Sequence, residues 1–208
     1  MIHIDVSILL PLRDAEPMVA PLVDTASLVQ RRVMARHHVD GRPLAFEFLA
    51  LDERSGDNTA SVLSVLHAKV PQLRTSADLE RGSALRTAAR IARGDTWLVM
   101  DHPIDADLAA WAIGQIIVGQ RAAIVPGELL AVHRSAGVDV LRELDGGLVV
   151  AQRAIARHLR RLGETPAFSP ASGVTRIERA FTFLRGHSNR LGLGFLDRPL
   201  PNPLRSRG

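Results

Sequence analysis

Apolar and polar positions alternate between two patterns along the first half of the chain. Short, mostly apolar runs predict buried strands, and longer amphipathic stretches predict helices. We expect strands at 2–10, 44–51 and 96–100, with a shorter one in PQLRT, which begins at Pro71. We expect helices at 16–36, from residue 58 to about Lys69, at 82–93, and over DADLAAWAIGQIIVG, which begins at Asp105. Strands and helices that alternate across short loops predict a parallel sheet covered by helices.

Several residues mark the ends of these elements. Pro11 is expected to stop the first strand, because proline has no backbone N–H to donate. Asp57 or Asn58 is expected to cap the helix that ends near Lys69. Gly94 is expected to end the helix at 82–93 as a C′ glycine.

The pattern loosens after residue 121. AAIVPGELLAVHRS, which begins at Ala122, predicts one or two short strands. We then expect a helix, a break at Gly146-Gly147 and a longer basic helix. One more helix is expected at 174–192. The segment at 191–208 has the composition of a loose tail.

Composition narrows the class of protein. A chain of 208 residues with 46% hydrophobic and 23% charged residues suits one α/β domain. No apolar run approaches the roughly 18 residues that a membrane span needs. The N-terminus resembles a strand and not a signal peptide, so we expect a cytoplasmic protein, at most peripheral to a membrane. The absence of cysteine excludes disulfides, thiolate zinc sites and cysteine nucleophiles.

The positive charge comes almost entirely from arginine. The formal net charge is +4, and Lys69 is the one lysine. Basic helices bind nucleic acid or anionic lipid in other proteins. Tyrosine is absent and aromatic residues make up 4%, which argues against base stacking and makes nucleic-acid binding unlikely. We interpret the basic helix near 153–161 as a solvated face, with contact to a lipid acceptor or a membrane surface as the alternative.

Acidic residues follow the ends of the predicted strands. Ligands of parallel sheets bind beyond the carboxyl ends of the strands, which selects the loops at 11–16, 52–57 and 101–105. All three loops are rich in Asp and Glu, and the chain has no G-x-G-x-x-G segment. Acidic loops of this kind suit a divalent cation or polar hydroxyl groups, because hard cations bind carboxylate oxygens.

The segments around these loops are similar to those of a known family. SILLPLRDAE parallels a strand followed by P-x-Y-N-E-E, and LALDERSGDNT parallels V-D-D-G-S-T-D-N-T. RGSALRTAARIARGDTWLVMD parallels G-x-A-x-R-x-G-x-x-x-A-x-G-D followed by an apolar strand and D-x-D. GELLAVHRS and SGVTR are weaker parallels. The chain resembles glycosyltransferase family 2, enzymes of the GT-A fold, and within it the polyprenyl-phosphate sugar synthases.

The resemblance implies a fold and an activity. The expected fold is α/β, of the GT-A nucleotide-diphospho-sugar transferase type, with a mostly parallel sheet flanked by helices. One domain at 1–190 would hold a nucleotide-sugar-binding half at 1–110 and an acceptor half at 111–190. The implied reaction moves a sugar from a nucleotide diphosphate sugar to a lipid-phosphate or polysaccharide acceptor.

The resemblance also implies a site. Its nucleotide-sugar-binding residues would be Pro11, Arg13, Glu16, Asp52, Glu53, Gly82, Arg86 and Asp101. Asp52 would accept a hydrogen bond from the base, and Arg86 would face the phosphates or support its loop. Asp101 would approach a magnesium or manganese ion that bridges the diphosphate and stabilises the departing nucleotide.

Several positions depart from the family pattern. In the opening turn, Arg13, Asp14 and Ala15 stand where the family has Tyr, Asn and the first Glu. In the next loop, Glu53 and Arg54 stand where it has the second Asp and the glycine. The second Asp of D-x-D is replaced by Pro103, which has no side-chain ligand for a metal.

The remaining candidates near this motif are ambiguous, and no catalytic base can be assigned. His102 is either a metal ligand or an exposed loop histidine, and we favour the second. Asp105 and Asp107 form a literal D-x-D but suit the cap and first turn of a helix. We therefore expect a metal that binds weakly, or only with the nucleotide, or not at all. The alternative function is a non-catalytic homologue that binds a nucleotide or a protein partner.

Overall fold

The computed structural model describes residues 3–39 and 41–169. These belong to a compact unit that spans Met1–Pro170. The helix expected at 174–192, the SGVTR segment, the domain boundary expected at residue 190 and the C-terminal tail lie outside the described residues.

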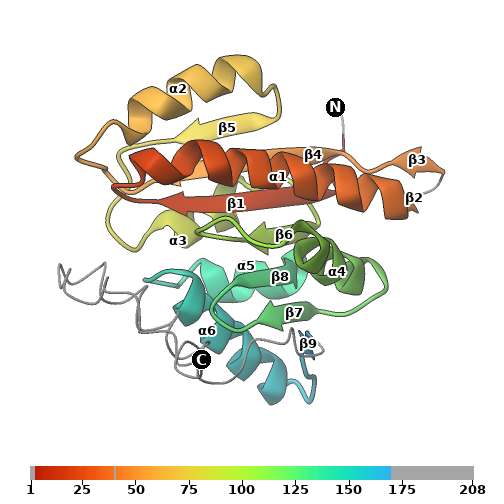
Figure 1. The fold of residues 1–208 in the computed structure, drawn as a ribbon. Coiled ribbons are helices and arrows are strands. Elements are labelled where there is room, and N and C mark those ends of the chain that lie inside the picture. Colours follow the sequence, from red (N-terminus) through yellow and green to blue (C-terminus); the bar gives the residue numbers. More distant parts are fainter. Residues whose placement is uncertain (1–2, 40, 170–208) are drawn as a thin grey trace, which may run out of the picture. The chain divides into compact units, whose positions relative to one another are not determined.

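One large sheet forms the centre of this unit (Figure 1). Its strands, in spatial order, are β5 (Leu73–Ser76), β4 (Phe46–Asp52), β1 (Val6–Leu12), β6 (Thr96–Val99), β8 (Leu129–His133), β7 (Ala122–Val125) and β9 (Ala167–Phe168). Pairing is parallel throughout except that β8 runs antiparallel to both of its neighbours. The predicted α/β class, with a mostly parallel sheet, is confirmed.

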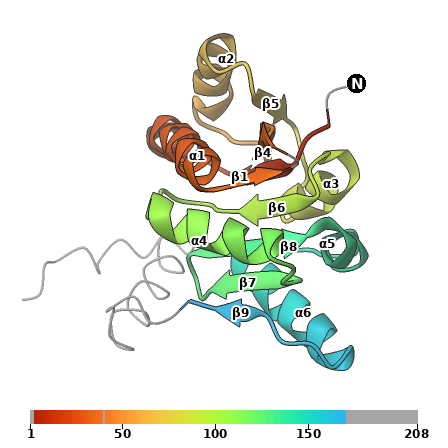
Figure 2. The same cartoon turned by 90° about the vertical axis from the view of Figure 1, so that its right-hand side faces the viewer.

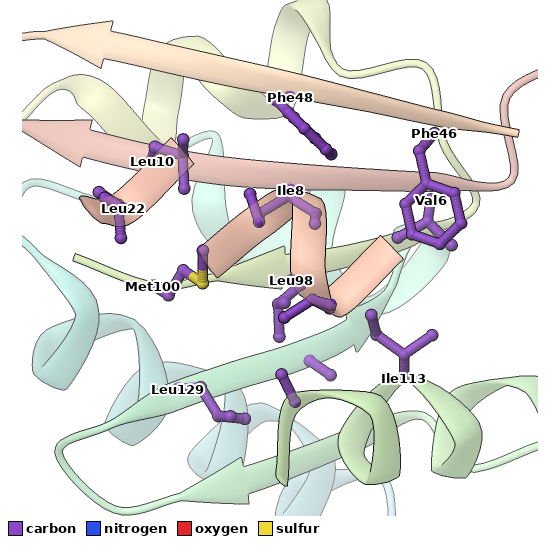
Figure 3. Packing of buried hydrophobic residues seen from close by; sticks show 14 of the residues in the cluster. Val6, Ile8, Leu10, Leu22, Phe46, Phe48, Leu98, Met100, Ile113 and Leu129 are labelled. Atoms are coloured by element: carbon purple, nitrogen blue, oxygen red, sulfur yellow. The ribbon is translucent and has the colours of Figure 1, made fainter. Parts of the chain in front are cut away.

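Helices cover both faces of the sheet, as the two views show (Figures 1 and 2). One face carries α1 (Glu16–Arg36), α2 (Thr59–Lys69) and α4 (Ala106–Ile117). The other carries α3 (Ala84–Ile91), α5 (Arg134–Leu141) and α6 (Leu148–Arg161). Strand periodicity divides the core between them, because successive side chains point to opposite faces. Ile8 and Leu10 pack in the first layer, as Figure 3 shows, and Leu9 packs in the second.

The prediction that Pro11 stops the first strand is wrong. It continues to Leu12, with Pro11 level with Leu51 of β4. Successive residues of a strand bond to alternate neighbours, and the carbonyl of Leu9 accepts from the N–H of Met100 on the β6 side. Pro11 lies two residues after Leu9 and therefore faces the same neighbouring strand, so its missing N–H would point toward β6. That strand has already ended at Val99, so no ladder bond is lost.

Gly94 does not act as the C′ glycine that the sequence predicted. Helix α3 ends at Ile91 with Ala92 as an extended C-cap, and the backbone of Gly94 is outside the left-handed region. A Cβ at residue 94 would lie 2.6 Å from the backbone N of Ser7. Glycine is therefore needed here because the α3–β6 loop presses against β1.

A small hairpin lies between α1 and the second long strand, β4. Strands β2 (His38–Val39) and β3 (Arg42–Pro43) pair antiparallel. Arg42 donates to both carboxylate oxygens of Asp5, at 2.7 and 2.8 Å, and the N–H of Ala45 donates to Asp5 at 2.7 Å. These bonds fasten the hairpin to the start of β1.

The second half contains the short strands and the broken helix that its pattern predicted. Helix α5 is separated from α6 by a loop in which Gly146 has φ +142. The basic residues of α6 are exposed at Arg153, Arg157, Arg160 and Arg161, while Ile155 and Leu159 are buried. The basic face is exposed, as both a solvated face and a surface for lipid contact require. Within 3–39 and 41–169, no helix is both long and apolar enough to cross a membrane.

Candidate functional site

The loops selected from the sequence leave one end of the sheet together. Leu12 at the end of β1 is level with Asp52 at the end of β4. On the other side of β1, the N–H of Met100 donates to the carbonyl of Leu9 at 3.1 Å. Asp52 and Asp101 therefore lie at the same end, which we call the carboxyl end of the sheet. The predicted parallel arrangement of these three strands is confirmed.

Backbone strain is concentrated in the loops at this end. The non-glycine residues with positive φ within the described residues are Asp14 (φ 47), Arg54 (φ 52) and Asp78 (φ 58). They follow β1, β4 and β5 respectively. Left-handed conformations of non-glycine residues cost on the order of 1 kcal/mol each and cluster at binding and catalytic sites.

Hydrogen bonds lock the β1 loop to the β4 loop. The N–H of Asp14 donates to the hydroxyl of Ser55 at 2.9 Å, and the N–H of Gly56 donates back to Asp14 Oδ1 at 2.7 Å. The N–H of Ala15 donates to Thr59 Oγ1 at 2.9 Å. The two loops therefore behave as one preformed unit.

Asp57 caps two helices at once. Its carboxylate accepts from the N–H of Glu16 at 2.9 Å, at the start of α1, and from the N–H of Thr59 at 3.0 Å, at the start of α2. The predicted cap of α2 is confirmed. Burial alone would raise the pKa of Asp57, but the hydrogen bonds from Thr59 and Glu16 lower it below its usual value. Glu16 is itself engaged, because the amide of Asn58 donates to its carboxylate at 3.2 Å.

The acidic pair that ends β4 is also engaged. Asp52 is 4% exposed, and its Oδ1 accepts from the N–H of Ser55 at 3.1 Å and from the Ser55 hydroxyl. Glu53 reaches to α3, where its Oε1 accepts from the N–H of Ala84 at 3.0 Å. Glu53 thus supplies the cap that Ser83, at the N-cap position, does not.

Gly82 and Arg86 connect the β5–α3 loop to the α5–α6 loop. Gly82, at φ +80, accepts from the N–H of Gly146 at 2.9 Å, and a Cβ on it would approach that nitrogen to 3.3 Å. Arg86 Nη1 donates to Asp145 Oδ1 at 2.7 Å, while its Nη2 lies 3.6 Å from Glu80 Oε2. Of the two roles expected for Arg86, these contacts favour support of a loop.

Asp101 is paired with the next residue in the chain. His102 Nδ1 lies 2.8 Å from Asp101 Oδ1. This hydrogen bond raises the pKa of His102 above its usual value against the opposing effect of burial, and the negative charges of Asp101 and Glu128 contribute. Asp105 caps α4, because its carboxylate accepts from the N–H of Asp107 at 2.7 Å, as its position had predicted.

The residues around Asp101 do not fit a metal held by protein groups alone. Among the residues that the structure describes, no group of three or more His, Asp or Glu side chains is placed to hold a metal ion. Pro103 offers no side-chain ligand, and Asp107 is paired with Arg36 across α1 and α4.

Glu128 is a residue of this region that the sequence did not single out. It closes the β7–β8 turn, where its N–H donates to the carbonyl of Val125 at 3.0 Å. Val99 of β6 is level with Leu130 of the antiparallel strand β8. The same register, continued by two residues, places Asp101 opposite Glu128. The signal for Glu128 depends on β8 running antiparallel beside β6, which a single sequence does not reveal.

Comparisons with known proteins identify the fold. No protein-family model and no curated protein sequence matches the chain. A mannosyltransferase from Pyrobaculum calidifontis, solved with GDP-Man and Mn2+, has a TM-score of 0.60 at 17% identity, covering 97% of this chain and 67% of that chain. Mannosyl-3-phosphoglycerate synthase from Rubrobacter xylanophilus has a TM-score of 0.50 at 18% identity, covering 77% and 75%. The chain therefore has the GT-A fold of nucleotide-sugar transferases.

Proposed function

We propose that this protein is a glycosyltransferase that moves a sugar from a nucleotide diphosphate sugar to a lipid-phosphate or polysaccharide acceptor. The supporting observation is the carboxyl end of the sheet, where the β1 and β4 loops are locked together in strained conformations beside Asp101. In an α/β sheet this is the end that binds ligands. A preformed site of this kind lowers the entropy cost of binding.

The contacts suggest how the proposed donor site is built. Pro11 and Glu16 of the β1 loop and Asp52 and Glu53 of the β4 loop would bracket the base and ribose, and Arg13 would extend from the β1 loop toward the phosphates. Asp52 keeps one oxygen on Ser55, which would hold the carboxylate in place to accept a hydrogen bond from the base. Gly82 and Arg86 would act indirectly, because their printed contacts are with Gly146, Asp145 and Glu80.

A divalent cation has a limited part in this proposal. We propose that magnesium or manganese binds weakly, together with the nucleotide, with Asp101 as its protein carboxylate. Such an ion would neutralise charge on the diphosphate when bound. The ligand set around Asp101 supports nothing stronger, since the proline at position 103 removes the second acid.

The alternative is a non-catalytic homologue that binds a nucleotide or a protein partner. Pro103 favours it, and so does the engagement of the loop carboxylates in hydrogen bonds within the protein. This alternative predicts nucleotide binding without turnover of a nucleotide sugar. Both proposals place the protein in the cytoplasm, at most in peripheral contact with a membrane through the exposed arginines of α6.

A binding experiment tests the shared element of both proposals. We would titrate UDP and GDP into the protein by calorimetry and repeat the titration with Asp52→Asn and with Asp139→Asn, an exposed control on α5. Loss of a charged acceptor in Asp52→Asn should weaken binding by about 1 to 3 kcal/mol. The control should bind normally.

Turnover then separates the two proposals. Release of nucleoside diphosphate from UDP- or GDP-sugars, with a short polyprenyl phosphate as acceptor, supports the enzyme. Binding without release supports the non-catalytic homologue. Absence of nucleotide binding, or equal affinity of the wild type and Asp52→Asn, would remove the basis for the enzyme and for a nucleotide-binding homologue, and would leave a homologue that binds a protein partner.

A further inference from the structure

The carboxylates at the carboxyl end accept hydrogen bonds from the protein itself. Asp14 accepts from Gly56, Glu16 from Asn58, Asp52 from Ser55, Glu53 from Ala84, and Asp57 from Glu16 and Thr59. An ionised carboxylate only accepts hydrogen bonds, so none of these groups can donate to a phosphate. The acids that made this end look like a cation site instead shape the two loops.

Two arginines lie within the same pair of loops. Arg13 and Arg54 sit between two contacts that join the loops: Glu53 N–H to Leu12 O at 2.9 Å, and Asp14 N–H to Ser55 Oγ at 2.9 Å. The side chain of Arg13 is 40% exposed, with Nε 3.6 Å from Asp14 Oδ2. Arg54 is exposed, and in the described part of the chain no carboxylate lies within 4.0 Å of its guanidinium.

The conformation of Arg54 adds a second observation. Its φ of 52 places an arginine in a region that glycine adopts without strain. Asp14, which follows Arg13, is held at φ 47. The hydrogen bonds between the two loops maintain this strained backbone, and they fix the backbone positions from which both arginine side chains extend. A position that carries a long cationic side chain despite the strain is a candidate for function.

We propose that Arg13 and Arg54 form a phosphate-binding pair that supplies positive charge to a nucleotide in place of a tightly bound metal ion. The proposal rests on the nucleotide site proposed above. A guanidinium presents five N–H donors in a fixed fork that matches phosphate geometry. Pro103 provides no second acid beside Asp101 for a metal, whereas the neighbouring loops carry two arginines, so arginine can supply the positive charge here.

The negative field of the nearby acids limits the size of the effect. Five carboxylates share these loops with two guanidinium groups, so attraction of an anion is partly offset. We therefore expect each arginine to change nucleotide affinity about tenfold, the lower range for a charge-assisted hydrogen bond. Affinity should also fall as salt concentration rises.

Calorimetry with UDP and GDP in the presence of EDTA tests the pair. The variants are Arg13→Gln, Arg54→Gly and, as a matched control, Arg31→Gln on the exposed side of α1. The wild type should bind the diphosphates without metal and bind uridine and guanosine far more weakly. Each site variant should lose about tenfold for the diphosphates and little for the nucleosides. Inorganic pyrophosphate should compete with UDP and GDP for the wild type, and about tenfold less effectively for each site variant.

Arg54→Gly separates binding from folding, because glycine relieves the left-handed strain. Its melting temperature without ligand should be unchanged or higher while its nucleotide affinity falls. Nucleotide binding that requires manganese and is insensitive to both arginine variants would overturn the pair and leave the proposed function intact. No binding of either nucleotide, with or without manganese, would overturn both proposals.

Discussion

The two ends of the sheet use acidic residues differently. At the amino end, Asp5 is bonded to Arg42 through both oxygens. Glu47, which is 3% exposed on β4, accepts from Arg74 and from the hydroxyl of Ser7 at 2.7 Å. In the β1 and β4 loops at the carboxyl end, the acids accept from backbone N–H groups, hydroxyls and the Asn58 amide, and the arginine nearest to one of them, Arg13, approaches Asp14 only to 3.6 Å.

The comparison shows which features distinguish a candidate site from structural polarity. Both ends contain engaged carboxylates, so the presence of acids does not separate them. Arg42 and Arg74 donate hydrogen bonds to the acids of the amino end, which marks that end as structural. At the carboxyl end, Arg13 approaches Asp14 only to 3.6 Å, and left-handed residues mark the loops as suited to a ligand. Changes at the amino end should therefore affect stability alone, and changes at the carboxyl end should affect binding as well.

The largest effect is expected from Glu47→Ala at the amino end. The change leaves three donors without their acceptor: the Ser7 hydroxyl, the Arg93 N–H and the Arg74 guanidinium. The free energy of unfolding should fall by about 3 kcal/mol, measured by urea denaturation, because one partner of a buried pair is removed. Glu47→Gln, which keeps an acceptor, should lose less. A change in UDP or GDP affinity of the folded protein would contradict the separation of the two ends.

Asp57→Ala should have a smaller effect on stability and an additional effect on binding. It removes the cap shared by α1 and α2, and should cost about 2 kcal/mol for the two helix starts. The β1 and β4 loops lose one of their connections, so nucleotide affinity should fall with stability. Asp57→Asn retains one of the two acceptor oxygens, so it should lose about half as much stability as Asp57→Ala. Full nucleotide affinity in Asp57→Ala would show that the loop connection is not needed for binding.

Asp5 predicts a dependence of stability on pH. Burial raises its pKa, but the hydrogen bonds from Arg42 and Ala45 and the charge of Arg42 outweigh burial, so the pKa of Asp5 in the folded protein lies below its usual value. The stabilisation is present above the unfolded pKa and is lost as the pH falls through the folded pKa. Asp5→Asn should therefore lose less stability than the wild type as the pH falls below about 4. Thermal unfolding across this range, with exposed Asp24→Asn as the control, measures it; equal curves for all three proteins would contradict the assignment.

The fold could be predicted from the sequence because its signals are local or periodic. Apolar runs located β1, β4 and β6, and the helix at 16–36 was predicted with the bounds that α1 has. The errors occurred where tertiary context overrode a local rule. Pro11 is tolerated because its neighbour strand has ended, and Gly94 is required by close packing on Ser7.

The candidate site was less predictable, because its chemistry depends on partners distant in the sequence. Asp57 caps α1 from 41 residues away, and Glu53 caps α3 from 31 residues away. Such partners decide whether a carboxylate is engaged by the protein, and a single sequence does not show them. The same holds for Glu128, whose place beside His102 depends on the direction of β8.

The smallest effect is expected at Asp101. If the arginine pair carries the charge of the phosphates, manganese should add little: no stabilisation alone, and about 1 kcal/mol, or about 3 °C in melting temperature, together with UDP or GDP. Asp101→Asn should abolish that increment. His102→Ala should raise it, because the change frees Asp101 Oδ1 from His102 Nδ1. A thermal-shift series with each nucleotide, with and without manganese, compares the three proteins. Strong stabilisation by manganese alone would point to a metal site that does not depend on the nucleotide, and the carboxyl end would then bind a cation in the way its acids first suggested.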